Sequence, residues 1–188
     1  MTKILFFDVE TTGLDSKING IHQLSGLIEI DGEIKESFDF KINPSPELAV
    51  DAEALKISGK TLEEIRSYPS EALVYRQFVA MLLKYIEKFN NRDKAFLAGW
   101  NNAHFDNDFL RAFFIRNNDK FFGSWFWSNP IDVMVLASQC LIEERAEMIN
   151  FKLMTVATFL LGKIDQSKLH DAQYDIELTR NIYHIVKF

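Results

Sequence analysis

Hydrophobic and polar positions recur along the chain with two periods, and the first of them predicts strands. Residues 4–7 form an apolar, β-prone run that is followed by two acids and the turn-forming Gly13. The segments 21–30 and 34–42 are typical of two further strands, with a hairpin turn at Gly32 between them. We therefore expect the domain to begin with three antiparallel strands.

The second period is helical. Apolar side chains recur at helical spacing from Glu71 to Phe89, behind a possible N-cap at Ser70. Residues 95–100 read as a strand parallel to the first, and further helices are expected over 109–117, over Ile131–Ile142 and after residue 170. The pattern predicts one α/β domain over residues 1–188, with a mixed five-stranded sheet, strands one to three antiparallel, and helices on both faces.

Composition narrows the class of protein. A chain of 188 residues with 47% hydrophobic content fits a single globular core. No apolar run approaches the ~20 residues that span a bilayer, and no basic leader precedes the first strand, so we expect a cytoplasmic protein without a membrane partner. The one cysteine, Cys140, excludes an internal disulfide and a cysteine-rich zinc site, and its apolar surroundings predict packing in or near the core.

Asp8 and Glu10 are the first candidates for chemistry. Because strand side chains alternate, both carboxylates project to the same side of the sheet. The nearest basic residues in sequence are Lys3 and Lys17, so the two acids would repel each other unless a cation neutralised them. The alternative is a solvent-exposed end of an edge strand. The hydroxyls and glycine that follow, in the segment 11–14, favour a metal pair beside a docked nucleotide.

Other polar residues lie at predicted helix starts. Asp106 precedes or opens a helix, where an acid is usually an N-cap, and Asp108 suits the first helical turn. His170 lies just ahead of the last helix, and imidazole is the side chain whose unperturbed pKa is near neutrality. Trp125 and Trp127 would share one face of an extended segment, either within the core or stacked on unpaired bases.

Three motifs together resemble the DEDDh (DnaQ-like) family of 3′–5′ exonucleases, which have a ribonuclease-H-like fold. They are FDVETTGL at residues 7–14, NAHFD at residues 102–106, and His170 followed by Asp175. The similarity runs over nearly the whole chain and is strongest to the exonuclease I branch, with the proofreading epsilon subunit of polymerase III as another relative. Between Asp171 and Asp175, the family spacing selects Asp175 as the ligand and leaves Asp171 as a helix cap.

The resemblance implies a two-metal site for phosphodiester hydrolysis. Asp8, Glu10, Asp106 and Asp175 would hold two Mg²⁺ or Mn²⁺ ions, with Asp8 as the bridge, and His170 would be the general base, with His104 as its rival. The residues expected to hold the terminal nucleotide are Thr11, Thr12, Gly13, Leu14, Asn102 and Phe105.

The implied substrate is the 3′ end of single-stranded nucleic acid, with DNA favoured over RNA. The net charge of −6 opposes long-range attraction of a polyanion, so we expect contact with a few terminal nucleotides only. Alternatives are an exoribonuclease of the same family and a non-catalytic module that binds nucleic acid or a polymerase. A DNA polymerase partner is possible in either case.

Overall fold

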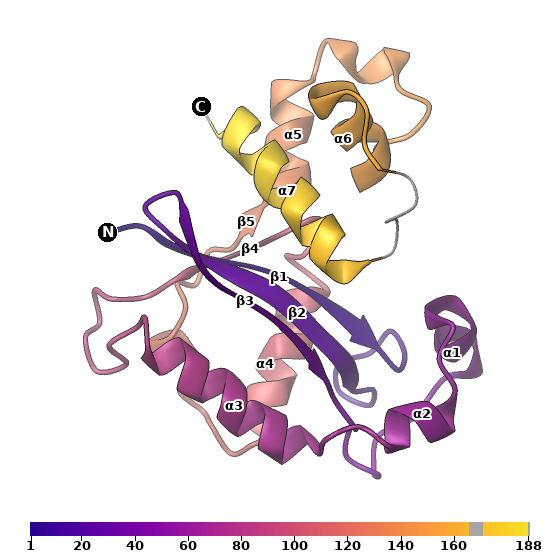
Figure 1. Cartoon of the computed structure of the whole chain (residues 1–188), viewed down its shortest axis with the longest axis vertical. Helices are drawn as coiled ribbons and strands as arrows, with labels where there is room; N and C mark the ends of the chain where they lie inside the picture. Colours follow the sequence, from indigo (N-terminus) through magenta and orange to yellow (C-terminus); the bar gives the residue numbers. More distant parts are fainter. Residues whose placement is uncertain (166–170, 188) are drawn as a thin grey trace.

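The computed structural model describes residues 1–165 and 171–187. Its centre is a five-stranded sheet in the order β3-β2-β1-β4-β5 (Figure 1). The first three strands pair antiparallel, and β4 and β5 extend the sheet in parallel with β1, which confirms the predicted mixed sheet. The strands are β1 (Lys3–Thr11), β2 (Ile21–Ile30), β3 (Glu33–Lys41), β4 (Phe96–Gly99) and β5 (Ile131–Asp132).

Helices cover both faces of the sheet, because the central strands carry apolar side chains on both sides. One face packs against α3 and α4 through a cluster that includes Leu5, Phe78 and Phe113. The other packs against α5, α6 and α7 through Ile4, Phe6 and Ile182. The helices are α1 (Ala52–Ser58), α2 (Leu62–Arg66), α3 (Glu71–Leu83), α4 (Asp106–Arg116), α5 (Val133–Cys140), α6 (Leu153–Leu161) and α7 (Ala172–Val186), with 3₁₀ turns at Phe122–Ser124 and Glu144–Glu147.

Several sequence-based expectations were wrong at the ends of elements. The helix that begins at Glu71 stops at Leu83 and not at Phe89, because the chain turns there to bury Ile86 while Phe89 stays 96% exposed. Residues 131 and 132 form β5, so the next helix starts at Val133, with Asp132 as its N-cap.

The structure also settles whether Cys140 and the two tryptophans are buried. Cys140 is exposed and not in the core, because it lies on the outward side of the last turn of α5. Trp125 is fully buried in the cluster under α3 and α4, which excludes base stacking for this residue, whereas Trp127 is half-buried against Phe96.

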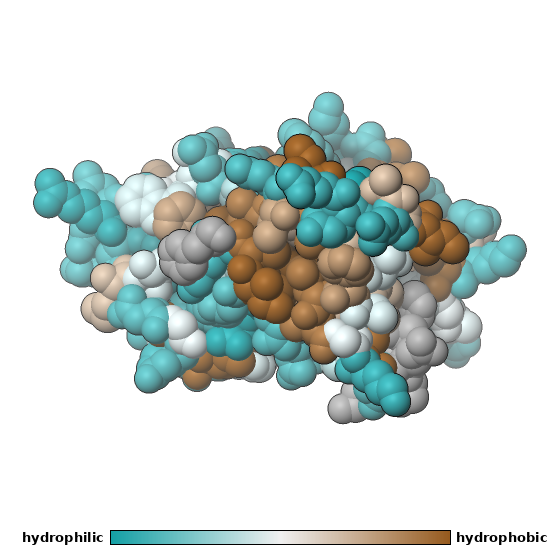
Figure 2. Space-filling model, turned by 90° about the horizontal axis from the view of Figure 1, so that it is seen from above, coloured by the Kyte–Doolittle hydropathy of each residue, from teal (hydrophilic) through white to brown (hydrophobic). Residues whose placement is uncertain are grey.

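Helix α7 contacts the sheet through the buried carboxylate of Glu29, which lies on β2. Glu29 of β2 accepts a hydrogen bond from Arg180 at 2.5 Å and contacts His184 at 2.8 Å. These contacts set the position of the helix that carries Asp175. At the end formed by α5–α7, Figure 2 shows an apolar area bordered by polar side chains. Among the described residues, no helix is long and apolar enough to cross a membrane.

Candidate active site

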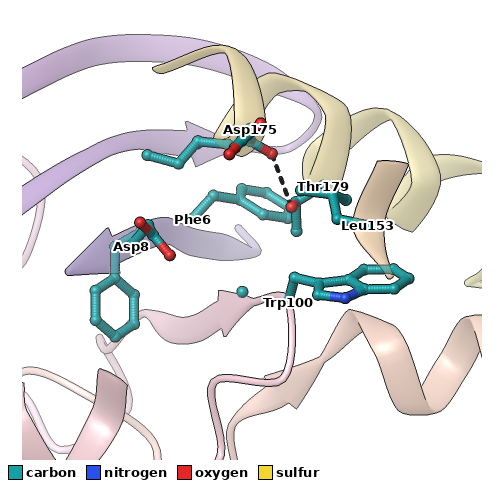
Figure 3. A pocket seen from close by; sticks show the side chains of 9 residues that line it. Phe6, Asp8, Trp100, Leu153, Asp175 and Thr179 are labelled. Atoms are coloured by element: carbon teal, nitrogen blue, oxygen red, sulfur yellow. Dashed lines mark hydrogen bonds between the residues drawn. The ribbon is translucent and has the colours of Figure 1, made fainter. Parts of the chain in front are cut away.

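Asp8 and Asp175 face each other across a cavity of about 230 Å³ at the end of β1. Asp8 comes from the strand and Asp175 from the first turn of α7, and both point into the cavity (Figure 3). Phe6, Trp100, Leu153 and Thr179 also line the cavity (Figure 3). The Thr179 hydroxyl donates to the main-chain carbonyl of Asp175 at 2.8 Å, a bond within the helix.

Asp106 joins this group from the opposite side of the strand end. It is the first residue of α4, it is only 6% exposed, and its Oδ1 accepts a hydrogen bond of 3.1 Å from the Val9 N–H. The N-cap of α4 is Phe105, so the usual role of an acid at a helix start does not apply to Asp106. Asp108, two residues later, is exposed, as expected for a simple first-turn acid.

The carboxylates on β1, α4 and α7 lie close enough together to shift one another's pKa values. Burial raises the pKa of Asp8 well above its usual range, and the carboxylates of Asp106, Glu10 and Asp175 raise it further. Burial likewise raises the pKa of Asp106 to about 7, although the Val9 N–H opposes the shift. A group of carboxylates whose charges destabilise one another is the environment that a divalent cation stabilises.

The donor set fits hard divalent ions, which prefer carboxylate oxygens. Within residues 1–165 and 171–187, no three His, Cys, Asp or Glu side chains already enclose a position for an ion.

The histidine assigned as general base cannot be placed, because His170 lies outside the described residues. Its rival His104 is exposed on the loop before α4. Asp171 caps α7 and accepts hydrogen bonds from the N–H groups of Gln173 and Tyr174 at 2.9 and 3.2 Å. Its side chain therefore serves the helix start, as the sequence predicted.

The loop after β1 forms one wall of a second, mostly apolar cavity of about 270 Å³. Leu14 is 84% exposed at its rim, and Phe105 closes it from the other side. Thr11 donates to the Gly13 carbonyl at 2.7 Å. Thr12 is fully buried, with its hydroxyl bonded to Ala49 O at 2.8 Å, so this side chain shapes the loop from within.

Gly13 is required by close packing. A Cβ at this position would lie 2.3 Å from both Asn19 Nδ2 and Asp51 Oδ2, so these two side chains would have to move to admit it. Asn102, another candidate, is fully buried, and its Nδ2 donates weakly to Asn107 at 3.5 Å. It lies behind the site and adjoins Gly99, where a Cβ would approach the Asn102 side chain to 2.8 Å.

Sequence reasoning missed the opposite wall of the Leu14 cavity. Helix α1, which had looked like a simple connector, contributes Glu53, Ala54 and Ile57. Ile57 is 78% exposed although it is apolar, and no local pattern in the sequence marks it as part of a cavity. Leu14 and Ile57 thus expose apolar surface on opposite walls of this cavity.

Two known proteins are similar in sequence to nearly the whole of this chain. The chain is 30% identical over 178 residues to a PolC-type DNA polymerase III from Mycoplasmopsis pulmonis, covering 94% of this chain and 11% of the polymerase. It is 26% identical over 206 residues to exodeoxyribonuclease I of Buchnera aphidicola, covering 97% of this chain and 39% of that enzyme. The chain thus spans less than half the length of these relatives.

Solved structures show the same fold. Exonuclease I of E. coli in complex with a dT13 oligonucleotide superposes with a TM-score of 0.77 at 22% identity, over 100% of this chain and 41% of that one. The zinc-ion-bound form of the E. coli exonuclease I complex with single-stranded DNA gives the same TM-score, over 100% of this chain and 40% of that one. The exonuclease family model RNase_T matches residues 5–183, and the chain therefore belongs to this exonuclease family.

Proposed function

We propose that this chain hydrolyses single-stranded nucleic acid from its 3′ end, with DNA as the favoured substrate, and releases nucleoside 5′-monophosphates. One observation carries the proposal: carboxylates from three distant segments converge at the end of β1 and raise the pKa of Asp8. Membership of the exonuclease family and the likeness to exodeoxyribonuclease I support it.

The residues divide into two groups. Asp8, Glu10, Asp106 and Asp175 would hold two Mg²⁺ or Mn²⁺ ions, which when bound supply an activated water and offset charge on the phosphate. The Val9 N–H fixes the direction of one Asp106 oxygen and leaves the other to the site. His170 would accept the proton of the attacking water as general base.

The second group would hold the end of the strand. The loop of Thr11, Thr12, Gly13 and Leu14 would place the terminal nucleoside in the apolar cavity, with its base between Leu14 and Phe105. Asn102 would support the turn behind the acids from its buried position. A cavity that is walled on both sides by α1 and this loop suits a terminus better than the middle of a strand.

The test follows the products of a single-stranded DNA oligomer labelled at its 5′ end. In Mg²⁺ we expect a ladder that shortens from the 3′ end, and in EDTA we expect no cleavage. Asp8→Asn should be inactive while folded, whereas the exposed Asp108→Asn should match the wild type. Cleavage of a circular single strand, or full hydrolysis after exhaustive chelation, would contradict the proposal.

The preference for DNA over RNA is a separate part of the proposal. A matched RNA oligomer in the same assay distinguishes DNA preference from the exoribonuclease alternative, since only contacts to the 2′-hydroxyl separate the two.

A DNA polymerase partner is supported by the match to PolC-type polymerases, of which this chain resembles a small part. Co-elution with the replicative polymerase of the source cell in gel filtration would test this partner.

A further inference from the structure

Two phenylalanine side chains outside the active site are exposed to solvent. Phe89 is 96% exposed, because the chain leaves α3 at Leu83 and turns to bury Ile86. Phe121, which directly precedes the 3₁₀ turn at residues 122–124, is 66% exposed. Neighbouring apolar side chains that forgo burial in this way mark candidate binding surfaces.

Both rings line one cavity of about 510 Å³, which we call the phenylalanine cavity. Its other lining residues are Lys88, Asn91, Lys94 and Ser124, so no acid among the described residues contributes to the wall. The volume lies within the range of about 300–1,000 Å³ that encloses a small ligand. In a protein with a net charge of −6, a wall with two lysines and no acid is a local reversal of sign.

Lys94 supplies a positive charge that no carboxylate neutralises. Its ammonium lies 5.2 Å from the centre of the Trp127 ring, and it forms no ion pair with another described residue. An ammonium carries three N–H groups. Lys94 can therefore bind an anionic group in the cavity without giving up an acidic partner.

Lys88 and Phe121 are held in place by one acid. Asp119 contacts the Lys88 ammonium at 3.2 Å and accepts hydrogen bonds of 2.7 Å from the Phe121 N–H and from the Tyr75 hydroxyl. The Asp119 side chain is only 10% exposed, so it lies behind the cavity and not in its wall. The Lys88 ammonium lies 5.6 Å from the centre of the Phe121 ring, which places a cation beside an exposed aromatic ring.

The charges next to the cavity are positive, already paired or directed elsewhere. Arg92 and Lys120 are exposed and adjoin lining residues in sequence. Asp93, in the same turn, forms an ion pair with Lys3, and Glu87 is exposed but does not line the cavity. The phenylalanine cavity therefore combines open aromatic rings with an excess of positive charge.

The cavity and the carboxylates lie at opposite ends of the sheet (Figure 1). Lys3, at the start of β1, donates to the Tyr85 carbonyl at 2.6 Å and pairs with Asp93, in the segment that carries Phe89. Asp8 lies five residues further along the same strand, which is about 17 Å at 3.3 Å per residue. A ligand that occupies both places must therefore be a long one.

We propose that the phenylalanine cavity is a second binding site for single-stranded nucleic acid, with bases stacked on Phe89 and Phe121 and phosphates bound by Lys88 and Lys94. Aromatic platforms in a basic groove bind single strands without regard to sequence. An acidic protein segment would pair with the lysines, but two aromatic faces left open beside them favour flat bases. The identity of the ligand rests on the proposed function.

Binding at both places requires a strand of sufficient length. A stacked single strand rises about 3.4 Å per nucleotide, so about five nucleotides cover 17 Å, and a path over the surface needs more. A trinucleotide therefore reaches the carboxylates alone. A long strand held at one place has a high effective concentration at the other, so its KM should be lower.

Steady-state hydrolysis of a DNA trinucleotide and of a DNA strand of about 30 nucleotides measures the effect. Phe89→Ala and Phe121→Ala should each raise KM for the long strand about tenfold, as expected for one lost stacked base, and leave KM for the trinucleotide unchanged. Lys94→Met should make the slope of log KM for the long strand against log[salt] shallower by about 0.7. An unchanged KM and slope for the long strand in Phe89→Ala and Lys94→Met would overturn the proposal.

Two exposed residues that lie away from the cavity provide matched controls. Phe159 lies on α6, which packs on the other face of the sheet, and Lys163 follows the same helix; both are exposed. Phe159→Ala and Lys163→Met remove the same kinds of side chain, so both should match the wild type. Because Phe89 is almost fully exposed, Phe89→Ala should keep the urea midpoint of the wild type and report on binding alone.

Fluorescence anisotropy in EDTA separates this inference from the proposed function, because it measures binding without cleavage. Phe89→Ala should bind the long strand about tenfold more weakly than the wild type. A strand of abasic sites keeps its phosphates and lacks its bases, so the wild type and Phe89→Ala should bind it equally. A wild type that binds in this way but cleaves no oligomer would refute the proposed function and support the second site.

A peptide of alternating aspartate and phenylalanine tests the competing occupant. If this peptide binds the wild type but not Phe89→Ala, while both proteins bind the long strand equally, the cavity binds a protein segment and the proposal is wrong. If the second site binds nucleic acid, the long strand should displace the peptide, and the abasic strand should displace it less well.

Discussion

The raised pKa of Asp106 makes a quantitative prediction about stability without metal. In the folded protein this carboxyl titrates at about 7, compared with an ordinary value of 3.8. At about 1.4 kcal/mol per pH unit, the gap corresponds to a cost of about 4 kcal/mol when the group is ionised in the fold. The side chain is only 6% exposed, so solvent screening reduces this figure little.

The direction in which stability changes with pH depends on whether the folded or the unfolded state binds the proton more tightly. Below pH 3.8 the carboxyl is protonated in both states and costs nothing, and between about pH 4 and pH 7 the folded protein holds the proton more tightly. In EDTA, the free energy of unfolding should therefore fall as the pH rises through this window. Asp106→Asn removes the charge and keeps an oxygen that can accept the Val9 N–H, so it should be more stable than the wild type at pH 8 by about 2–4 kcal/mol.

Urea denaturation at pH 5 and pH 8, in EDTA and in Mg²⁺, checks the prediction. In EDTA, the stability advantage of Asp106→Asn over the wild type should be about 2–3 kcal/mol larger at pH 8 than at pH 5, and it should shrink in Mg²⁺, which favours the ionised wild type. Asp108→Asn, on the exposed side of the same helical turn, is the control and should follow the wild type. If Asp106→Asn shows the same pH dependence as the wild type in EDTA, the electrostatic account of the site is wrong.

Three further changes test separate parts of the molecule. His170→Ala should lower the rate by ~100-fold to 10,000-fold while calorimetry shows metal binding retained, and His104→Ala should stay active; the reverse result would reassign the base. Leu14→Ala should raise KM and leave the urea midpoint unchanged, because Leu14 is 84% exposed, and an unchanged KM would remove it from the binding surface. Gly13→Ala should destabilise the protein by about 1–3 kcal/mol, since its Cβ would meet Asn19 and Asp51 at 2.3 Å, and an unchanged urea midpoint would contradict this packing.

The sequence predicted the parts of the fold that depend on local pattern. Alternation along β1 placed Asp8 and Glu10 on one face, and the apolar run 95–100 correctly indicated a parallel strand. The ends of the helices were wrong because burial decides them. Ile86 leaves the helical path to enter the core, and residues 131–132 pair with β4 before the helix can begin.

The candidate site was predicted less completely. The acids could be selected by motif, but the register shift where Glu10 pairs with Gln23 and Thr11 pairs with Ile21 depends on how the loop after β1 closes, and a linear pattern carries no register. The wall supplied by Ile57 arises where α1 folds back over the loop, through the bond from Asp51 N to Thr12 O at 2.8 Å. Such long-range contacts leave no periodic signal.

The contact between Glu29 and Arg180 also affects the order in which the parts of the chain fold. Glu29 and Arg180 are 151 residues apart in the chain, and their contact joins the sheet to the helix that carries Asp175. Contacts of such separation form late, since a long loop must close before they stabilise anything. A growing chain therefore carries Asp8, Glu10 and Asp106 long before it carries a complete set of acids. Because α7 is synthesised after the other elements described here, the proposed cleavage of nucleic acid would begin only once the chain has been made through this helix.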